Sequence, residues 1–222
     1  MVGKRSKTVR LKTAKGRTAS SQRWLRRQLN DPYVQEAQRL GYRSRSAFKL
    51  LQLDEKFKFL YKGQRVVDLG AAPGGWCQVA ANRVLTEKTG NIVGLDLLPM
   101  DPIPGVNLLQ TDFMSQEGLN ELMKILTDKV DLVISDMAAS TTGHAPTDHI
   151  RTAGLCEAAF DFAIDVLARD GVFLAKVFKG GSEHTLLARM KNTFKTVKHA
   201  KPNASRSESP ETYVVAQGFR TS

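Results

Sequence analysis

The feature that most restricts the fold is a regular alternation of short apolar segments with helical segments from residue 63 onward. The first apolar segment, RVVDL, is short and β-branched, as expected for a buried strand of a parallel sheet. Strands joined by helical crossovers form an open, mostly parallel α/β sheet with helices on both faces. The predicted strands are 65–69, 91–95, 106–110, 130–135 and 172–177, and the predicted helices are 75–85, 116–127, 148–168 and 182–192.

Two further predicted strands, 193–199 and 213–218, have no helical pattern between them. Parallel neighbours need a long crossover, so these two strands are expected to form an antiparallel pair that completes a seven-stranded sheet. The helix over 148–168 is predicted to end at the Asp170-Gly171 turn, and Ser182 is a suitable cap for the helix that follows.

Helical signals also precede the sheet. Asp31 is followed by a proline, which is typical of a helix start, and Ser44 or Ser46 precedes an apolar stripe that Gly63 is expected to end. Residues 1–19 offer little apolar surface to bury. We therefore predict a basic disordered arm over 1–19 and a single domain over 20–222. Within that domain, 20–62 form N-terminal helices and 63–222 form the Rossmann-like core.

The positive charge is concentrated at the N-terminus. The chain has a net charge of +11, and residues 1–30 hold ten of its 33 Lys and Arg residues but no Asp or Glu. Such a segment is typical of a nucleic-acid-binding arm. A mitochondrial transit peptide and a solvated tail that binds nothing are the alternatives. No apolar run is long enough for a membrane span, and two cysteines, Cys77 and Cys156, fit a reducing cytoplasm better than a disulfide scaffold.

Aspartates stand at the carboxyl ends of three predicted strands, where ligands bind in sheets of this kind. They are Asp96, Asp112 and Asp136. Carboxylates accept hydrogen bonds from ribose hydroxyls and amines but repel phosphates, so the three together favour an adenosine-like ligand. Capping of the next helix is the alternative, and it suits Asp112 best because Ser115 is close.

The loop after the first strand, DLGAAPGGW, allows a close approach of the backbone to a ligand. It lacks the GK[ST] ending of a phosphate-binding loop and the GxGxxG pattern of a dinucleotide site. At the end of the fifth strand, Lys176 lies within an apolar run. A lysine in that position either extends its ammonium group to the surface or has a functional role in the site. The three nearby aspartates favour the functional role.

Four motifs occur in order: VVDLGAAPGGW, DLLPMDP, SDMA and KVF. Together they closely resemble the RrmJ/FtsJ (RlmE) group of ribosomal RNA 2′-O-ribose methyltransferases, over residues 23–218. The resemblance implies a Rossmann-like class I methyltransferase fold with an antiparallel last strand. It also implies a catalytic Lys–Asp–Lys–Glu tetrad, which matches Lys49, Asp136, Lys176 and Glu211, with Lys176 as the proton acceptor.

The same resemblance implies S-adenosyl-L-methionine as methyl donor, bound by Gly74, Trp76, Asp96, Asp112 and Asp136. It implies a uridine of 23S ribosomal RNA in the large ribosomal subunit as substrate. The target must be RNA, because only ribose carries the 2′-hydroxyl. We expect a cytoplasmic monomer, with no membrane partner and no metal, since no His or Cys cluster is present. Transfer RNA or a messenger cap as substrate, a catalytically silent ribosome assembly factor and a nicotinamide-dependent oxidoreductase are the alternatives.

Overall fold

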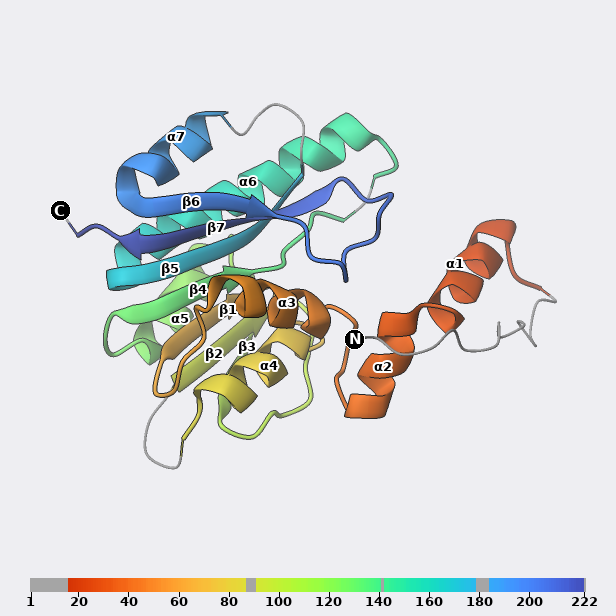
Figure 1. Ribbon diagram of the computed structural model, residues 1–222, viewed down its shortest axis with the longest axis horizontal. Helices are drawn as coiled ribbons and strands as arrows, with labels where there is room; N and C mark the ends of the chain where they lie inside the picture. The colour runs from red at the N-terminus through yellow and green to blue at the C-terminus, as the bar shows by residue number, and fades with distance from the viewer. Residues whose placement is uncertain (1–15, 87–90, 141, 179–183, 222) are drawn as a thin grey trace.

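The computed structural model describes residues 16–86, 91–140, 142–178 and 184–221. Seven strands form one sheet in the order β3-β2-β1-β4-β5-β7-β6, with helices packed on both faces and the N-terminal helix extending away from the sheet (Figure 1). The helices are α1 (Ala19–Leu29), α2 (Pro32–Leu40), α3 (Ala47–Phe57), α4 (Gly75–Val84), α5 (Gln116–Ile125), α6 (Ala145–Val166) and α7 (His184–Thr193). The strands are β1 (Arg65–Leu69), β2 (Asn91–Asp96), β3 (Val106–Gln110), β4 (Val130–Ser135), β5 (Leu167–Phe178), β6 (Phe194–Ala200) and β7 (Glu211–Phe219).

The sheet is mixed in the way that the sequence predicts. Strands β1 to β5 pair in parallel, and β7 lies antiparallel between β5 and β6. The order reverses direction at β1, so the carboxyl ends of β1, β2 and β4 meet around one crevice. The predicted α/β fold with an antiparallel last strand is therefore confirmed.

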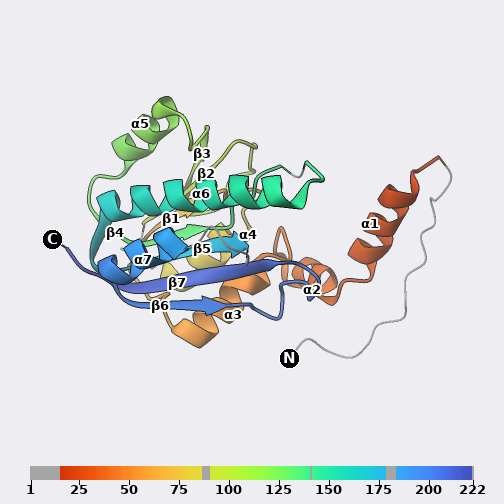
Figure 2. The same cartoon turned by 90° about the horizontal axis from the view of Figure 1, so that it is seen from above.

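Adjacent residues of each strand point to opposite faces of the sheet and build two separate cores. In β1, Val67 joins a core with residues of α5, α6 and α7, whereas Val66 joins a core with residues of α3 and α4. Figure 2 shows α5 and α6 on one side of the sheet and α3 on the other. Burial on both faces explains why these strands are continuously apolar.

Two predicted helix ends are wrong. The third helix ends at Phe57 and not at Gly63, because Lys58 adopts a left-handed conformation and the Asp54 carboxylate accepts hydrogen bonds from the amides of Phe59 and Leu60. These bonds satisfy backbone groups after the helix and turn the chain toward β1.

The second error concerns the helix before β5. Helix α6 ends at Val166, and the predicted Asp170-Gly171 turn lies inside β5 as an irregularity, since Leu167 pairs with Val130 but Val172 pairs with Leu132. The predicted cap Ser182 lies outside the described residues, which resume at the start of α7.

Asp68 is an ionisable residue in the middle of the sheet. Its side chain is fully buried; Oδ2 accepts a hydrogen bond from Cys77 Sγ at 3.2 Å, and Oδ1 has no hydrogen-bond partner among the described residues. Burial raises the pKa of Asp68 to about 7; the charges of Asp136 and Asp96 act in the same direction and the Cys77 hydrogen bond opposes them. The folded protein therefore holds a proton here that the unfolded chain loses.

This proton makes the free energy of unfolding depend on pH. The carboxyl ionises near 3.8 in the unfolded chain and near 7 in the folded protein, so the contribution of Asp68 is complete below pH 3.8 and is lost as pH rises through 7. The loss is about 1.4 kcal/mol for each unit of pKa difference. We expect Asp68→Asn to lack this loss, as measured by urea denaturation of both proteins. If the difference between the unfolding free energies of the wild-type protein and Asp68→Asn stayed constant from pH 4 to pH 8, the assignment would be wrong.

Candidate active site

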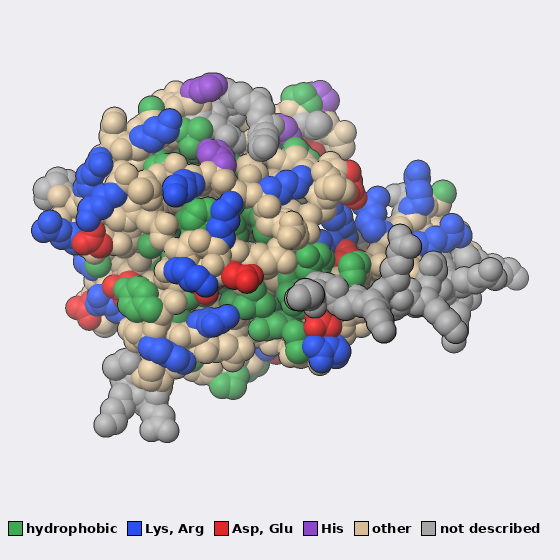
Figure 3. Space-filling view, in the orientation of Figure 1, with side chains coloured by type: hydrophobic (Ala, Val, Ile, Leu, Met, Phe, Trp, Pro, Cys, Tyr) green, Lys and Arg blue, Asp and Glu red, His purple; other side chains and the backbone are tan. Residues whose placement is uncertain are grey.

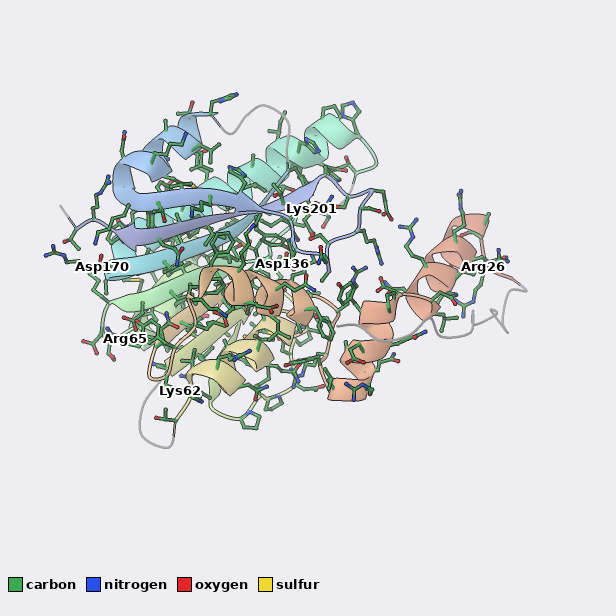
Figure 4. The ribbon with its side chains drawn as sticks, in the orientation of Figure 1. Arg26, Lys62, Arg65, Asp136, Asp170 and Lys201 are labelled. Carbon is green, nitrogen blue, oxygen red and sulfur yellow. The ribbon has the colours of Figure 1, made fainter. Side chains whose placement is uncertain are left out.

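The structure brings the four predicted catalytic residues together at the carboxyl end of the sheet. Lys49 comes from the first turns of α3, Asp136 directly follows β4, Lys176 lies near the end of β5, and Glu211 opens β7. Figure 4 shows Asp136 at the end of the sheet that faces α1, opposite the end that carries Arg65 and Asp170. Residues 162 positions apart in the sequence, Lys49 and Glu211, are thus in direct contact.

The four side chains form a closed set of ion pairs. Lys49 Nζ lies 2.8 Å from Glu211 Oε2 and 3.7 Å from Asp136 Oδ2. Lys176 Nζ lies 2.9 Å from Asp136 Oδ1 and 3.8 Å from Glu211 Oε2. Lys176 Nζ also donates to the backbone oxygen of Asp136 at 2.7 Å. Two ammonium and two carboxylate groups balance each other, which allows charged groups to remain in a site that is largely shielded from water.

The ion pairs with the two lysines change the pKa of Asp136, whose side chain is only 16% exposed. Burial alone would raise this pKa, but the charges of Lys176 and Lys49 and the hydrogen bond from Tyr213 outweigh burial and lower it. Asp136 therefore remains ionised at neutral pH and holds both lysines.

Tyr213 is part of the cluster, although the sequence did not suggest it. Its hydroxyl donates to Asp136 Oδ1 at 2.6 Å, its ring lies 5.6 Å from Lys49 Nζ, and it is directly paired with Lys176 across β5 and β7. Burial, together with the charges of Asp136 and Glu211, raises its pKa well above 10, so it is a neutral donor. Tyr213 follows Glu211 by two residues, and this period-2 spacing within a strand was the available signal.

Ser205 is a second residue that sequence reasoning missed. It lies in the segment between β6 and β7, is 6% exposed, and donates from Oγ to Glu211 Oε1 at 2.7 Å. The other oxygen of Glu211 accepts from Lys49. Ser205 therefore orients the carboxylate, but no sequence pattern indicates it.

A cavity of about 420 Å³ opens beside the cluster, at the ends of β1, β2, β3 and β4. Three predicted ligand residues, Asp96, Asp112 and Asp136, line it. Asp96 accepts hydrogen bonds from the amides of Ala72 and Leu98, and Asp112 accepts one from the amide of Met114. A carboxylate has about four acceptor positions, so both retain capacity for a ligand. The apolar lining is Leu95, Leu97, Leu98, Phe113, Met114, Met137 and Leu155.

The two other predicted donor-binding residues, Gly74 and Trp76, do not line this cavity. Trp76 is buried, donates from Nε1 to the backbone oxygen of Ser46 and packs on Tyr213 with ring centroids 5.8 Å apart. A Cβ on Gly74 would meet Ile103 at 2.8 Å. Both residues therefore support the loop and the cluster in this structure, and direct contact with the donor remains a prediction.

Comparison with known proteins agrees with this geometry. A family model described as FtsJ-like methyltransferase matches residues 42–219. Two relatives are called ribosomal RNA large subunit methyltransferase E. The one from Paramagnetospirillum magneticum is 58% identical and the alignment covers 99% of this chain and 91% of the relative; the one from Novosphingobium aromaticivorans is 59% identical, with 95% and 94% covered.

A crystal structure from Plasmodium falciparum, assigned as a ribosomal RNA methyltransferase, superimposes with a TM-score of 0.71. It is 32% identical in sequence, and the match covers 80% of this chain and 98% of that one. The matched residues 42–219 contain all four members of the ion-pair cluster and the three aspartates of the neighbouring cavity. The chain belongs to the FtsJ-like methyltransferase family.

Proposed function

We propose that this protein methylates a ribose 2′-hydroxyl of a uridine in 23S ribosomal RNA of the large subunit, with S-adenosyl-L-methionine as donor. The observation that carries the proposal is the double role of Asp136, which lines the cavity of about 420 Å³ and also holds Lys176 at 2.9 Å. A donor in the cavity and a base in the cluster would therefore both lie next to one carboxylate. The names of the relatives support large-subunit ribosomal RNA as substrate over transfer RNA or a messenger cap.

The cavity residues fit the proposed donor. When bound, S-adenosyl-L-methionine supplies a methyl group on a positively charged sulfur. Asp96 and Asp112 present carboxylate oxygens that suit ribose hydroxyls and an exocyclic amine, while Leu97 and Phe113 provide apolar surface for a base. Asp136 offers a negative charge at the end of the cavity nearest the lysines.

In the proposed mechanism, Lys176 receives the proton of the acceptor hydroxyl. A neutral amine has two N–H bonds and one lone pair. Asp136 accepts from both N–H bonds, through Oδ1 at 2.9 Å and the backbone oxygen at 2.7 Å, which leaves the lone pair for the ribose. The 2′-oxygen would bond the methyl carbon while the carbon–sulfur bond of the donor breaks and its electron pair stays on sulfur, and the proton of the broken O–H bond would pass to Lys176 Nζ. Holding the oxygen in line with the methyl group supplies a further part of the rate.

The other members of the cluster position these groups. Glu211 is shared between the lysines, at 2.8 Å from Lys49 and 3.8 Å from Lys176, so it limits the movement of both. Lys49 also compensates the charge of Asp136 when Lys176 is neutral, at 3.7 Å. We assign Lys49 to binding the acceptor ribose together with Glu211, because both also line an open cavity on the other side of the cluster.

We further propose that the protein acts as a cytoplasmic monomer. Both cysteines are buried and neither forms a disulfide within the described residues, as expected of a protein from a reducing compartment. Among the described residues, the exposed large apolar side chains other than Leu97, Leu98 and Met114 at the donor cavity lie on different segments, which supports a monomer. None of the described helices has the length and hydropathy that a bilayer crossing needs.

The donor site is tested by Asp112→Ala. Loss of a hydrogen bond to a charged acceptor costs about 1.5–3 kcal/mol, so we expect donor affinity to fall about 10- to 100-fold in calorimetry. Glu121→Ala, an exposed acid on the neighbouring α5, is the matched control and should bind normally. Equal affinity in both variants would remove Asp112 from the site.

The chemical step is tested by Lys176→Ala and Lys176→Arg under single-turnover conditions. Loss of a general base typically costs about 10²–10⁴-fold in rate. Arginine keeps the charge but does not deprotonate in proteins, so we expect the arginine variant to be as slow as the alanine variant while both bind the donor. Substantial activity in the arginine variant would reduce Lys176 to a source of charge, and near-normal rates in both would remove it from the mechanism.

The proposed RNA-binding role of the basic arm is tested by deleting residues 2–15, which leaves Thr18 as the cap of α1. RNA affinity should fall at low salt, and the loss should shrink as salt rises because counterion release drives such contacts. A second variant with glutamine at each of the six Lys and Arg residues of this segment keeps its length and should behave alike. Unchanged affinity at low salt would favour a transit peptide or a solvated tail.

A further inference from the structure

A second large cavity, of about 650 Å³, lies between the N-terminal helices and the segment that follows β6. Arg27 of α1 and Tyr33 of α2 belong to one wall, and Lys201 and Arg206 belong to the other. We infer that this cavity binds the backbone phosphate and sugar of a nucleotide that flanks the methylated ribose. The inference rests on the proposed function and names a binding site for the same RNA strand.

The cavity adjoins a second cavity that reaches the catalytic cluster. A smaller cavity of about 250 Å³ is lined by Lys49 and Glu211, and it shares Arg45 and Arg206 with the larger one. The two guanidinium groups therefore form a common wall between the acceptor site and the outer cavity. An RNA strand whose ribose reaches Lys49 has neighbouring phosphates that meet these two arginines first and the outer cavity next.

The charges of the outer cavity favour an anion. Four cations line it, and the two carboxylates, Asp31 and Glu208, only partly neutralise them. Asp31 is already engaged by Arg45 in a direct ion pair and lies 3.7 Å from Arg206. Two positive charges are thus left over once each carboxylate is counted against one cation.

Among the four cations of the outer cavity, Lys201 is the one whose charge is least neutralised by carboxylates. Its Nζ donates to the backbone oxygens of Ser207 and Ser209, at 3.1 and 2.6 Å, and makes no ion pair within the described part of the chain. Its charge is therefore held in place at the edge of the cavity but is not neutralised there. Figure 4 shows Lys201 at the same end of the sheet as Asp136.

The surroundings favour a polyanion over a small free anion. Helix α1 carries Arg23, Arg26 and Arg27 and no acidic residue, and Figure 3 shows Lys and Arg side chains over α1 and across the adjoining face, with few acidic ones among them. The cavity is also several times larger than a phosphate ion needs. Arg27 pairs only distantly with Glu208, at 3.9 Å and with both side chains more than half exposed, so it is available to a ligand.

Substitutions on the two walls test the inference. Arg27→Ala and Lys201→Ala should each raise the Kd and KM for unmethylated large-subunit RNA about three- to tenfold near 0.1 M salt. Each should also lower the slope of log affinity against log salt by about 1, the effect of one lost phosphate contact. A purely structural role would not change this slope. Lys124→Ala, an exposed lysine on α5 at the other side of the sheet, is the control and should change neither quantity.

Because Lys201 also holds its own segment in place, Arg27 supplies the independent test. Arg27→Cys introduces an accessible thiol into a protein whose natural cysteines are buried, so a thiol-directed photoactivated cross-linker reports on this position alone. We expect a cross-link to a nucleotide adjacent in sequence to the methylated ribose, and none from Lys124→Cys. Cross-links at unrelated nucleotides, or salt slopes equal to the wild-type value in both alanine variants, would overturn the inference. A wild-type protein that binds this RNA but does not methylate it would instead contradict the proposed function.

Discussion

The proposed active site depends on one largely buried carboxylate, that of Asp136. It follows the central strand β4 and contacts Lys176, Lys49 and Tyr213, and it also lines the proposed donor cavity. The sheet order places β4 between β1 and β5, so this single group reaches both the donor side and the lysine side. The ion pairs and hydrogen bonds offset the cost of burying the charge, which an isolated carboxylate could not bear.

The outer parts of the molecule hold this arrangement in place. Ser205 orients Glu211. The segment that carries Ser205 is tied to α3 by Gln52, which accepts from the amide of Ala204, and to the turn before α3 by Arg45, which donates to the backbone oxygen of Ala204. Helix α3 in turn carries Lys49. The cluster is thus closed by contacts between segments about 150 residues apart in the sequence, and the segment that follows β6 also forms one wall of the proposed RNA-binding cavity.

How well the sequence predicted the site follows from how each residue is positioned. Asp96, Asp112, Asp136 and Lys176 end strands, and strand ends meet at one edge of a parallel sheet, so their grouping was predictable from local patterns. Lys49 lies on a helix outside the sheet, and Glu211 starts a strand whose register depends on pairing with β5. Only the family resemblance indicated these two. Tyr213 and Ser205 were missed because a buried aromatic in a strand and a serine in a loop are ordinary features of any fold.

The central claim is that the four charged groups act as one unit, and a double-mutant cycle between Lys49 and Glu211 tests it most directly. The rate of methyl transfer is measured in single turnovers for Lys49→Ala, Glu211→Ala and the double variant, with donor and RNA saturating. If the contact at 2.8 Å couples them, the double variant should be about as slow as the slower single variant. If the two effects multiply, the residues act independently, and the account of a shared cluster is wrong.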